Sequence, residues 1–205
     1  MLRFIKPIRL PAIALRAMSL VLAWPLMAQA QAQADLWTTV KTEPNIVLVA
    51  RHMEVGRGKG THYDPSGRCE GEVMLTAKGR RQAEGLGQAF KDQGITPERL
   101  NVVASAMCRV RDTAMLAFGK ATLDPALRES FSGGGGRQNE FLDAAEGWVR
   151  KLRGPTPLLL MTHHPNIDAL TGEQPDFGQV VVTKSDETGA LQVLGVLRVI
   201  DPGAF

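Results

Sequence analysis

Three of the four histidines and two arginines lie close behind the ends of three short apolar segments. The segments and the residues that follow them are 46–50 with Arg51 and His52, 102–104 with Arg109, and 158–161 with His163 and His164. Apolar segments without polar alternation predict strands covered on both faces. Because ligands bind outside the carboxyl ends of strands in open α/β sheets, we expect these residues to converge on one site.

The residue types at this predicted site suit a phosphoryl group. Two guanidinium groups brought together repel each other unless an anion lies between them, and their planar forks match phosphate oxygens. The free nitrogen of an imidazole is a good nucleophile near neutral pH, so His52 could attack phosphorus. The other ring nitrogen of His52 is then expected to donate to a backbone carbonyl.

These segments resemble the three signatures of the histidine phosphatase superfamily, which has the phosphoglycerate-mutase-like fold. The matching stretches are Arg51-His52, Ser105-x-x-x-Arg109-x-x-x-Thr113-Ala114 and Thr162-His163, with Leu75-Thr76-x-x-Gly79-x-x-Gln82-Ala83 resembling the helix start between the first two. The order and spacing match over residues 45–172. The resemblance implies that His52 forms a phosphohistidine, that Arg51, Arg109 and His163 surround the phosphoryl oxygens, and that no metal or other cofactor takes part.

Two residues depart from the family pattern, which usually has glycine in their positions. Met53 follows the nucleophile, so its amide could bind phosphate only if its side chain turns out of the pocket. His164 follows His163, and consecutive residues leaving a strand point in different directions. We therefore expect His163 in the pocket and His164 at its rim, binding phosphate through its amide.

The residue that protonates the leaving group has two candidates. Leu127-Arg128-Glu129 resembles the Leu-x-Glu context of the acid in the mutase-like branch, although a solvated surface glutamate would look the same. Glu54, two residues past His52, is the alternative. Asp168 is expected instead to stabilise the first turn of a helix that begins near Asn166.

Two other classes of function are alternatives to a phosphatase. His52-Met53-Glu54 reads as the H-x-E start of a zinc-deaminase signature, but no C-x-x-C completes it and no H-x-x-x-H occurs, so the sequence argues against a metal. A catalytically silent phosphate-binding protein on the same fold would retain the arginines and His52, and only a hydrolysis assay separates it from an enzyme.

The first 34 residues have the features of a secretory signal peptide. Four basic and no acidic residues accompany an apolar run over residues 17–28, which is followed by Ala-x-Ala cleavage options. The apolar run is shorter than the roughly 20 residues that a spanning helix needs, and Pro25 interrupts it. We therefore expect a signal peptide over residues 1–34, a mature histidine phosphatase domain over residues 35–205, a periplasmic or secreted location, and no membrane contact after cleavage.

The net charge of +3 belongs to this signal segment. Without its four basic residues the chain has 20 basic and 21 acidic residues, which gives no reason to expect a nucleic-acid partner. The expected partner is a small phosphomonoester, and the oligomeric state cannot be read from the sequence. The signal peptide, the size and the cysteine positions resemble exported bacterial phosphatases grouped with the lipopolysaccharide-core heptose phosphatases, which implies a sugar phosphate of the envelope as substrate.

Cys69 and Cys108 are the only cysteines, and an even number in an oxidising compartment permits one disulfide. The alternative is two separate buried thiols. On the chain-entropy model, the bridge would stabilise the fold by roughly 3–4 kcal/mol.

The remaining pattern alternates strands with helices, which predicts a three-layer α/β/α fold with a mainly parallel sheet. Residues 180–182 and 191–200 add a C-terminal antiparallel hairpin. One helix is predicted from Thr76 to Gly94 and a second from Cys108 to Phe118. A third is an amphipathic helix whose apolar face carries Phe141, Ala145, Trp148 and Leu152 and which stops at Gly154-Pro155. The four glycines 133–136 lack the context of a nucleotide loop and are expected to form a surface loop.

Overall fold

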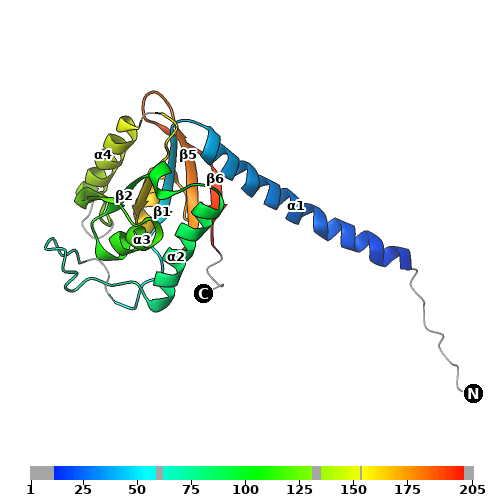
Figure 1. The fold of residues 1–205 in the computed structure, drawn as a ribbon, viewed down its shortest axis with the longest axis horizontal. Helices are drawn as coiled ribbons and strands as arrows, with labels where there is room; N and C mark the ends of the chain where they lie inside the picture. Colours follow the sequence, from blue (N-terminus) through cyan, green and yellow to red (C-terminus); the bar gives the residue numbers. More distant parts are fainter. Residues whose placement is uncertain (1–11, 59–61, 131–134, 153, 201–205) are drawn as a thin grey trace, which may run out of the picture. The chain divides into compact units, whose positions relative to one another are not determined.

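The computed structural model of the 205-residue chain describes residues 12–58, 62–130, 135–152 and 154–200. The chain divides into two compact units, residues 1–35 and residues 36–205. In the first unit, the described residues belong to helix α1 (Ala12–Thr42), whose last turns lie in the second unit (Figure 1). Among the described residues, no helix combines the length and the apolar character needed to span a membrane. The signal peptide and the location of the mature domain stay predictions.

The second unit is built on one six-stranded sheet in the order β3-β2-β4-β1-β5-β6 (Figure 1). Its strands are β1 (Ile46–Arg51), β2 (Asn101–Ser105), β3 (Thr122–Asp124), β4 (Leu158–Thr162), β5 (Gln179–Ser185) and β6 (Leu191–Arg198). The first four in the sheet are parallel, and β5 and β6 pair antiparallel to complete it. The predicted mainly parallel sheet with a C-terminal hairpin is confirmed. Strand β3 was not predicted, because three residues, two exposed and one half-buried, carry no hydrophobic pattern.

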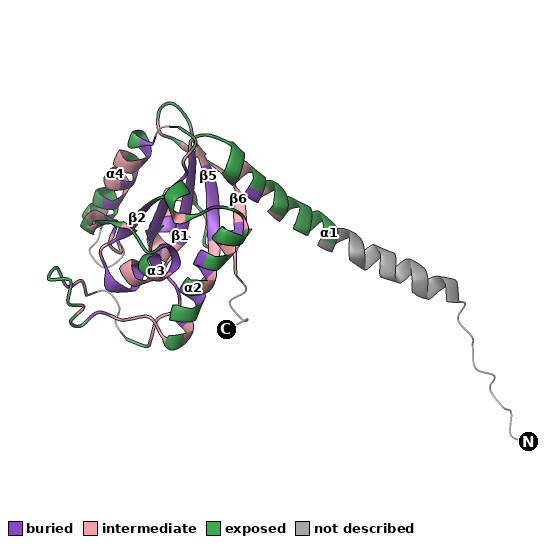
Figure 2. Cartoon of the chain, viewed as in Figure 1, coloured by how far each residue is buried: buried purple, intermediate pink, exposed green. Residues whose placement is uncertain are grey.

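Helices cover both faces of this sheet, which confirms the three layers. They are α2 (Ala77–Asp92), α3 (Cys108–Phe118), α4 (Gly135–Lys151) and α5 (His164–Thr171), with the short 3₁₀ helices η1 (Pro97–Arg99) and η2 (Pro125–Leu127). Successive side chains of a strand point to opposite faces of the sheet. Leu48 accordingly packs in the cluster that includes residues of α2 and α3, whereas Val49 packs in the cluster that includes residues of α4 and α5. Buried residues accordingly fill most of β1, β2, β4 and β5, whereas β6 at the edge of the sheet is mostly half-buried or exposed (Figure 2).

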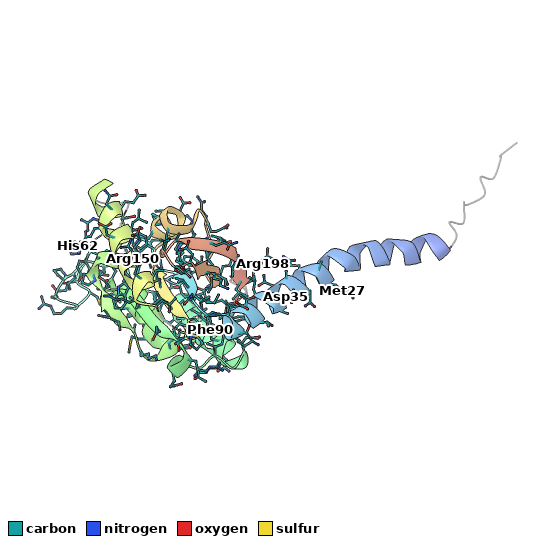
Figure 3. All side chains as sticks on the ribbon, turned by 90° about the horizontal axis from the view of Figure 1, so that it is seen from above. Met27, Asp35, His62, Phe90, Arg150 and Arg198 are labelled. Carbon is teal, nitrogen blue, oxygen red and sulfur yellow. A yellow bond between two sulfur atoms is a disulfide. The ribbon has the colours of Figure 1, made fainter. Side chains whose placement is uncertain are left out.

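The ends of the helices follow from capping and from close packing. Thr76 caps α2 by accepting a hydrogen bond from the amide of Gly79 at 2.9 Å, as predicted. A side chain at Gly87 would overlap the carbonyl oxygen of Ala117, so this glycine lets α2 and α3 approach closely. Figure 3 shows Phe90, whose ring packs edge-on against that of Phe118 in α3, with the two ring centres 5.4 Å apart.

Two of the four glycines at 133–136 differ from the predicted surface loop. Helix α4 begins at Gly135, so Gly135 and Gly136 are helical, while residues 131–134 lie outside the described residues. Each residue added to a formed helix gains one backbone hydrogen bond, which offsets the helix cost of about 1 kcal/mol for a glycine. The apolar face that contains Phe141 therefore extends its helix back into the glycine run.

Residues of the last turns of α1 belong to the core of the second unit. Trp37 and Val40 are buried against the α2 side of the sheet, and the Trp37 ring meets the Phe90 ring edge-on at 5.1 Å. The domain core thus begins shortly after residue 35.

Candidate active site

The structure brings four of the predicted residues together at the carboxyl edge of the parallel strands. Arg51 ends β1 and His52 follows it, Arg109 lies in the first turn of α3 after β2, and His163 follows β4. The rings of His52 and His163 are 5.4 Å apart, and Arg109 Nη2 lies 3.3 Å from His163 Nδ1. The fourth histidine, His62, is exposed on the segment between β1 and α2, away from Phe90 (Figure 3).

Hydrogen bonding fixes the tautomer of His52. Its Nδ1 lies 2.8 Å from the carbonyl oxygen of Met53, and because a carbonyl only accepts, Nδ1 carries the proton. Its backbone amide donates to the carbonyl of Thr162 at 3.2 Å, which ties it to the end of β4. The Nε2 atom is left unprotonated, as the sequence predicted for a nucleophile.

The surroundings keep this imidazole neutral. His52 is only 5% exposed, and its pKa is lowered to about 3, chiefly by burial. The hydrogen bond to Met53 raises this pKa, whereas the charges of Arg109 and Arg51 lower it further. At neutral pH the ring is therefore in the form that can attack phosphorus.

We expect His52 to make the folded state less stable as the pH falls. The unfolded residue takes up a proton near pH 6.5 and the folded one only near pH 3, so between these values the unfolded state binds more protons. The free energy of unfolding should fall through this window by up to about 1.4 kcal/mol per pH unit from His52 alone. His52→Asn should flatten the profile in urea unfolding, whereas exposed His62→Asn should not, and equal slopes in all three proteins would contradict the assignment.

His163 is fully buried and held by two protein groups. Its Nδ1 accepts from Arg109 Nη2, so Nε2 carries the proton and donates to Ser105 Oγ at 3.1 Å. Burial lowers its pKa well below the usual value, and His52, Arg109 and Arg51 lower it further. His163 therefore orients Arg109 as a neutral ring, and a phosphoryl oxygen would reach it only by competing with one of these partners.

The two arginines carry buried donors with no hydrogen-bond partner among the described residues. These atoms are Arg51 Nε and Arg109 Nη1. Burial lowers the pKa of both guanidinium groups, and for Arg51 the charge of Arg109 adds to this while Asp176 and Glu129 oppose it. Two mutually repelling cations, the half-buried Arg51 and the buried Arg109, each with a buried and unused donor, are the arrangement that an oxyanion would stabilise.

The site also includes a segment that the sequence analysis did not single out. The Arg51 guanidinium lies 4.2 Å from the centre of the Phe177 ring, and that ring is 6.1 Å from the His52 ring. Phe177 and its neighbour Asp176 lie between α5 and β5, outside every strand end and motif. No sequence signal marks them.

Met53 is fully buried, and its side chain packs in the core beside α2 and α3. The side chain thus turns away from the other site residues, as expected. Its amide, however, donates to Thr113 Oγ1 at 3.2 Å, and Thr113 in turn donates to the carbonyl of Arg109 at 2.7 Å. The amide of Met53 is engaged within the protein, which removes the phosphate contact that the sequence suggested for it.

The two candidate acids have different surroundings. Glu129 Oε2 lies 3.0 Å from Arg109 Nη2, and the Glu129 side chain is 21% exposed. Glu54 accepts from Thr76 Oγ1 at 2.9 Å and lies 3.8 Å from Lys78, so it supports the start of α2. Glu129 therefore contacts a site residue directly, whereas the side chain of Glu54 is bonded to residues at the start of α2.

The start of α5 corrects one expectation and locates another residue. The helix begins at His164, with Pro165 in its first turn, so Asp168 is the fifth helical residue and lies beyond the turn it was expected to stabilise. Proline is pre-organised for a helix start, which moves that start ahead of Asn166. His164 itself is half-buried beside the site residue His163.

Residues 47–171, more than half of the chain, match the family model of the histidine phosphatase superfamily, branch 1. The chain belongs to the histidine phosphatase superfamily. It is a histidine phosphatase with the phosphoglycerate-mutase-like fold. No protein of curated function has a significantly similar sequence.

Solved structures share the fold of this histidine phosphatase at low sequence identity. Mycobacterial glucosyl-3-phosphoglycerate phosphatase is 13% identical with a TM-score of 0.56, over 75% of this chain and 98% of that one. The protein histidine phosphatase SixA, complexed with tungstate, is 17% identical with a TM-score of 0.51, over 75% and 97%. Phosphoserine phosphatase from Entamoeba histolytica is 13% identical with a TM-score of 0.51, over 74% and 96%.

The two cysteines of the histidine phosphatase form the predicted disulfide. Cys69 and Cys108 are bonded, with their Cα atoms 5.8 Å apart, which excludes the alternative of two separate thiols. Cys108 is the first residue of α3 and immediately precedes Arg109. Within the described ranges, no group of three or more histidine, cysteine or acidic side chains is arranged to hold a metal ion.

Asn166 is a further residue of the site that the sequence analysis missed. Its side chain accepts from the amide of Ser130 at 2.9 Å and donates to the carbonyl of Arg128 at 2.9 Å and to Thr162 Oγ1 at 2.8 Å. It therefore fastens both sides of Glu129 to the strand end that carries His163. The sequence indicated only a helix start near Asn166, because Arg128 and Ser130, its hydrogen-bond partners, lie far away along the chain.

Proposed function

We propose that this histidine phosphatase hydrolyses a phosphomonoester through a phosphohistidine formed on His52. The observation that carries the proposal is the tautomer of His52, whose Nδ1–H is held by Met53 while Nε2 stays unprotonated beside the half-buried Arg51 and the buried Arg109. A neutral nucleophile next to unused cationic donors is the pair of features that phosphoryl transfer requires.

In the first step, His52 Nε2 attacks phosphorus, and the bond from phosphorus to the leaving oxygen breaks. Arg51 Nε and Arg109 Nη1 donate to the equatorial oxygens as charge develops on them. Glu129 delivers a proton to the leaving alcohol. In the second step, Glu129 takes a proton from water, the water oxygen attacks phosphorus, and the electron pair of the broken nitrogen–phosphorus bond returns to His52.

The test is turnover together with trapping of the intermediate. The protein should release phosphate from monoesters in the presence of a chelator, and acid-labile, base-stable phosphate should be mapped to His52 by mass spectrometry. Loss of activity with chelator, or phosphate on another residue, would refute the mechanism. Phosphate binding without turnover would instead indicate a silent member of the fold.

Glu129→Gln tests the proposed acid. The variant should slow substrates with poor leaving groups by roughly 10²–10⁴-fold and activated aryl phosphates much less, because only a poor leaving group needs the proton. Glu54→Gln makes the same chemical change at the other candidate and should affect both substrates alike. The measurement is kcat over a leaving-group series, and a uniform effect of Glu129→Gln would remove Glu129 from the mechanism.

For the substrate we propose a sugar phosphate of the cell envelope, met outside the cytoplasm. The features of the N-terminus, the disulfide and the near-neutral charge of residues 35–205 support an exported enzyme without steering toward a polyanion. Two of the similar structures are named for small phosphorylated molecules. A panel of sugar phosphates, phosphoserine and phosphohistidine peptides, with N-terminal sequencing of the exported protein, would decide between these classes.

A further inference from the structure

Glu72 is a buried carboxylate that the proposed mechanism does not use. It lies on the segment between β1 and α2 and is 9% exposed. Its Oε2 accepts from the amide of Cys108 at 2.7 Å, and its Oε1 accepts from the amide of Asp64 at 3.0 Å. Both oxygens are therefore held by backbone donors.

The bond to Cys108 lies at the first turn of α3. The first amides of a helix have no partner within the helix, and the N-cap residue Met107 supplies no side-chain cap. Glu72 takes this role from 36 residues away, and its negative charge also suits the positive end of the helix dipole. The cap of α3 thus comes from a different part of the chain.

The residue next to this cap is Arg109. Its guanidinium is 3% exposed and lies within electrostatic reach of Glu72 as well as of Glu129. A shift of the first turn of α3 would move Arg109 relative to His52 and His163, because Arg109 lies on this turn whereas His52 and His163 follow the ends of β1 and β4.

The segment that carries Glu72 is fastened to α3 at further points. The disulfide joins Cys69 to Cys108, and Arg111 of α3 donates to the carbonyl of Gly67 at 3.0 Å and to the sulfur of Cys69 at 3.1 Å. Asp64 closes the same segment by accepting from the amide of Glu70 at 3.0 Å. Glu72 is therefore presented to the helix by a loop with little freedom to withdraw.

We infer that Glu72 is a positioning residue, whose carboxylate fixes the first turn of α3 and so aims Arg109 at the phosphoryl group. The disulfide keeps the loop within reach, and the carboxylate sets the angle of the turn. This inference rests on the proposed role of Arg109 in binding the phosphoryl group.

Glu72→Gln is the sharpest test, because glutamine keeps the shape but turns one acceptor into a donor that faces an amide. The matched control is Glu70→Gln on the same loop, where the side chain is exposed beside Arg68. In the disulfide-bonded protein, Glu72→Gln should lower kcat roughly tenfold to a hundredfold, the scale of a misplaced catalytic group, and weaken binding of inorganic phosphate, while the control changes neither.

A double-mutant cycle separates positioning from a general loss of structure. With Arg109→Ala present, Glu72→Gln should have no further effect on the affinity for inorganic phosphate. An equal further loss in that background, or a Glu72→Gln variant that matches Glu70→Gln in kcat and in phosphate affinity, would overturn the inference.

The test also covers a variant that fails to fold and a wild-type protein that shows no turnover. If Glu72→Gln does not fold, Glu72→Asp keeps the charge with a shorter reach and is judged by the same two readouts against the wild-type protein. If the wild-type protein shows no turnover, the proposed function fails, and the phosphate-affinity cycle still reports on Glu72.

Discussion

Replacing His52 with alanine should lower kcat on the order of 10⁴-fold or more, as the loss of a covalent nucleophile does in other hydrolases. The reason is that Nε2 of His52 is an unprotonated nitrogen that accepts no hydrogen bond from the described residues, whereas both nitrogens of His163 are hydrogen-bonded, one to Arg109 and one to Ser105. No phosphoenzyme should be trapped. Binding of inorganic phosphate should persist, because both arginines remain.

The control for this variant is His62→Ala, which removes an exposed histidine outside the site. It should leave kcat and phosphate affinity unchanged. A His52→Ala protein that retains even a few per cent of wild-type turnover would mean that water is activated directly, without a phosphohistidine.

The second large effect is expected for Arg109→Ala, which should lower kcat/KM by roughly 10³–10⁵-fold, the range found for arginines that stabilise phosphoryl transfer. Arg109 is buried and holds Glu129 and His163, and its buried Nη1 has no hydrogen-bond partner among the described residues. Its removal takes away a donor to the phosphoryl oxygens and also leaves Glu129 without its cationic partner. Steady-state kinetics on the best monoester measures the effect.

Two companion variants interpret this result. Arg109→Lys keeps the positive charge but loses the planar fork, so it should recover only part of the activity. Arg150→Ala removes an exposed arginine that pairs with Glu146 and should be close to wild type. If Arg109→Lys were as active as the wild-type protein, charge alone would suffice and the fork geometry would be irrelevant.

The fold was predictable where local pattern and tertiary packing agree. The strands β1, β2 and β4 are buried on both faces and read as short apolar runs, and Thr76 and Gly94 mark the ends of α2. The prediction failed at β3 and at the start of α4, where the decisive interactions are pairing with β2 and helix propagation into glycines. Neither leaves a pattern in the sequence.

The predicted part of the candidate site consists of residues that lie at or shortly after the ends of strands. His52, Arg109 and His163 could be placed because the carboxyl edge of a parallel sheet brings strand ends together. Glu72 and Phe177 could not, since their partners lie far along the chain and no motif names them. That one ring nitrogen of His52 donates to a backbone carbonyl was predictable, but that this carbonyl belongs to Met53 was not.

The departure from glycine at Met53 has a structural explanation. A buried side chain in the core and an amide bonded to Thr113 connect the nucleophile to the helix that carries Arg109. Residue 53 therefore contributes to rigidity rather than to phosphate contact, and its carbonyl still sets the tautomer of His52.

The hydrogen bonds of Asn166 carry a consequence for the backbone around the proposed acid. One side chain accepts from the amide of Ser130 and donates to the carbonyl of Arg128, so the residues on both sides of Glu129 are tied to one point on α5. The same side chain donates to Thr162 Oγ1, next to His163. A substitution at Asn166 would therefore release both flanks of Glu129 together, and the position of Glu129 relative to His163 depends on a single amide.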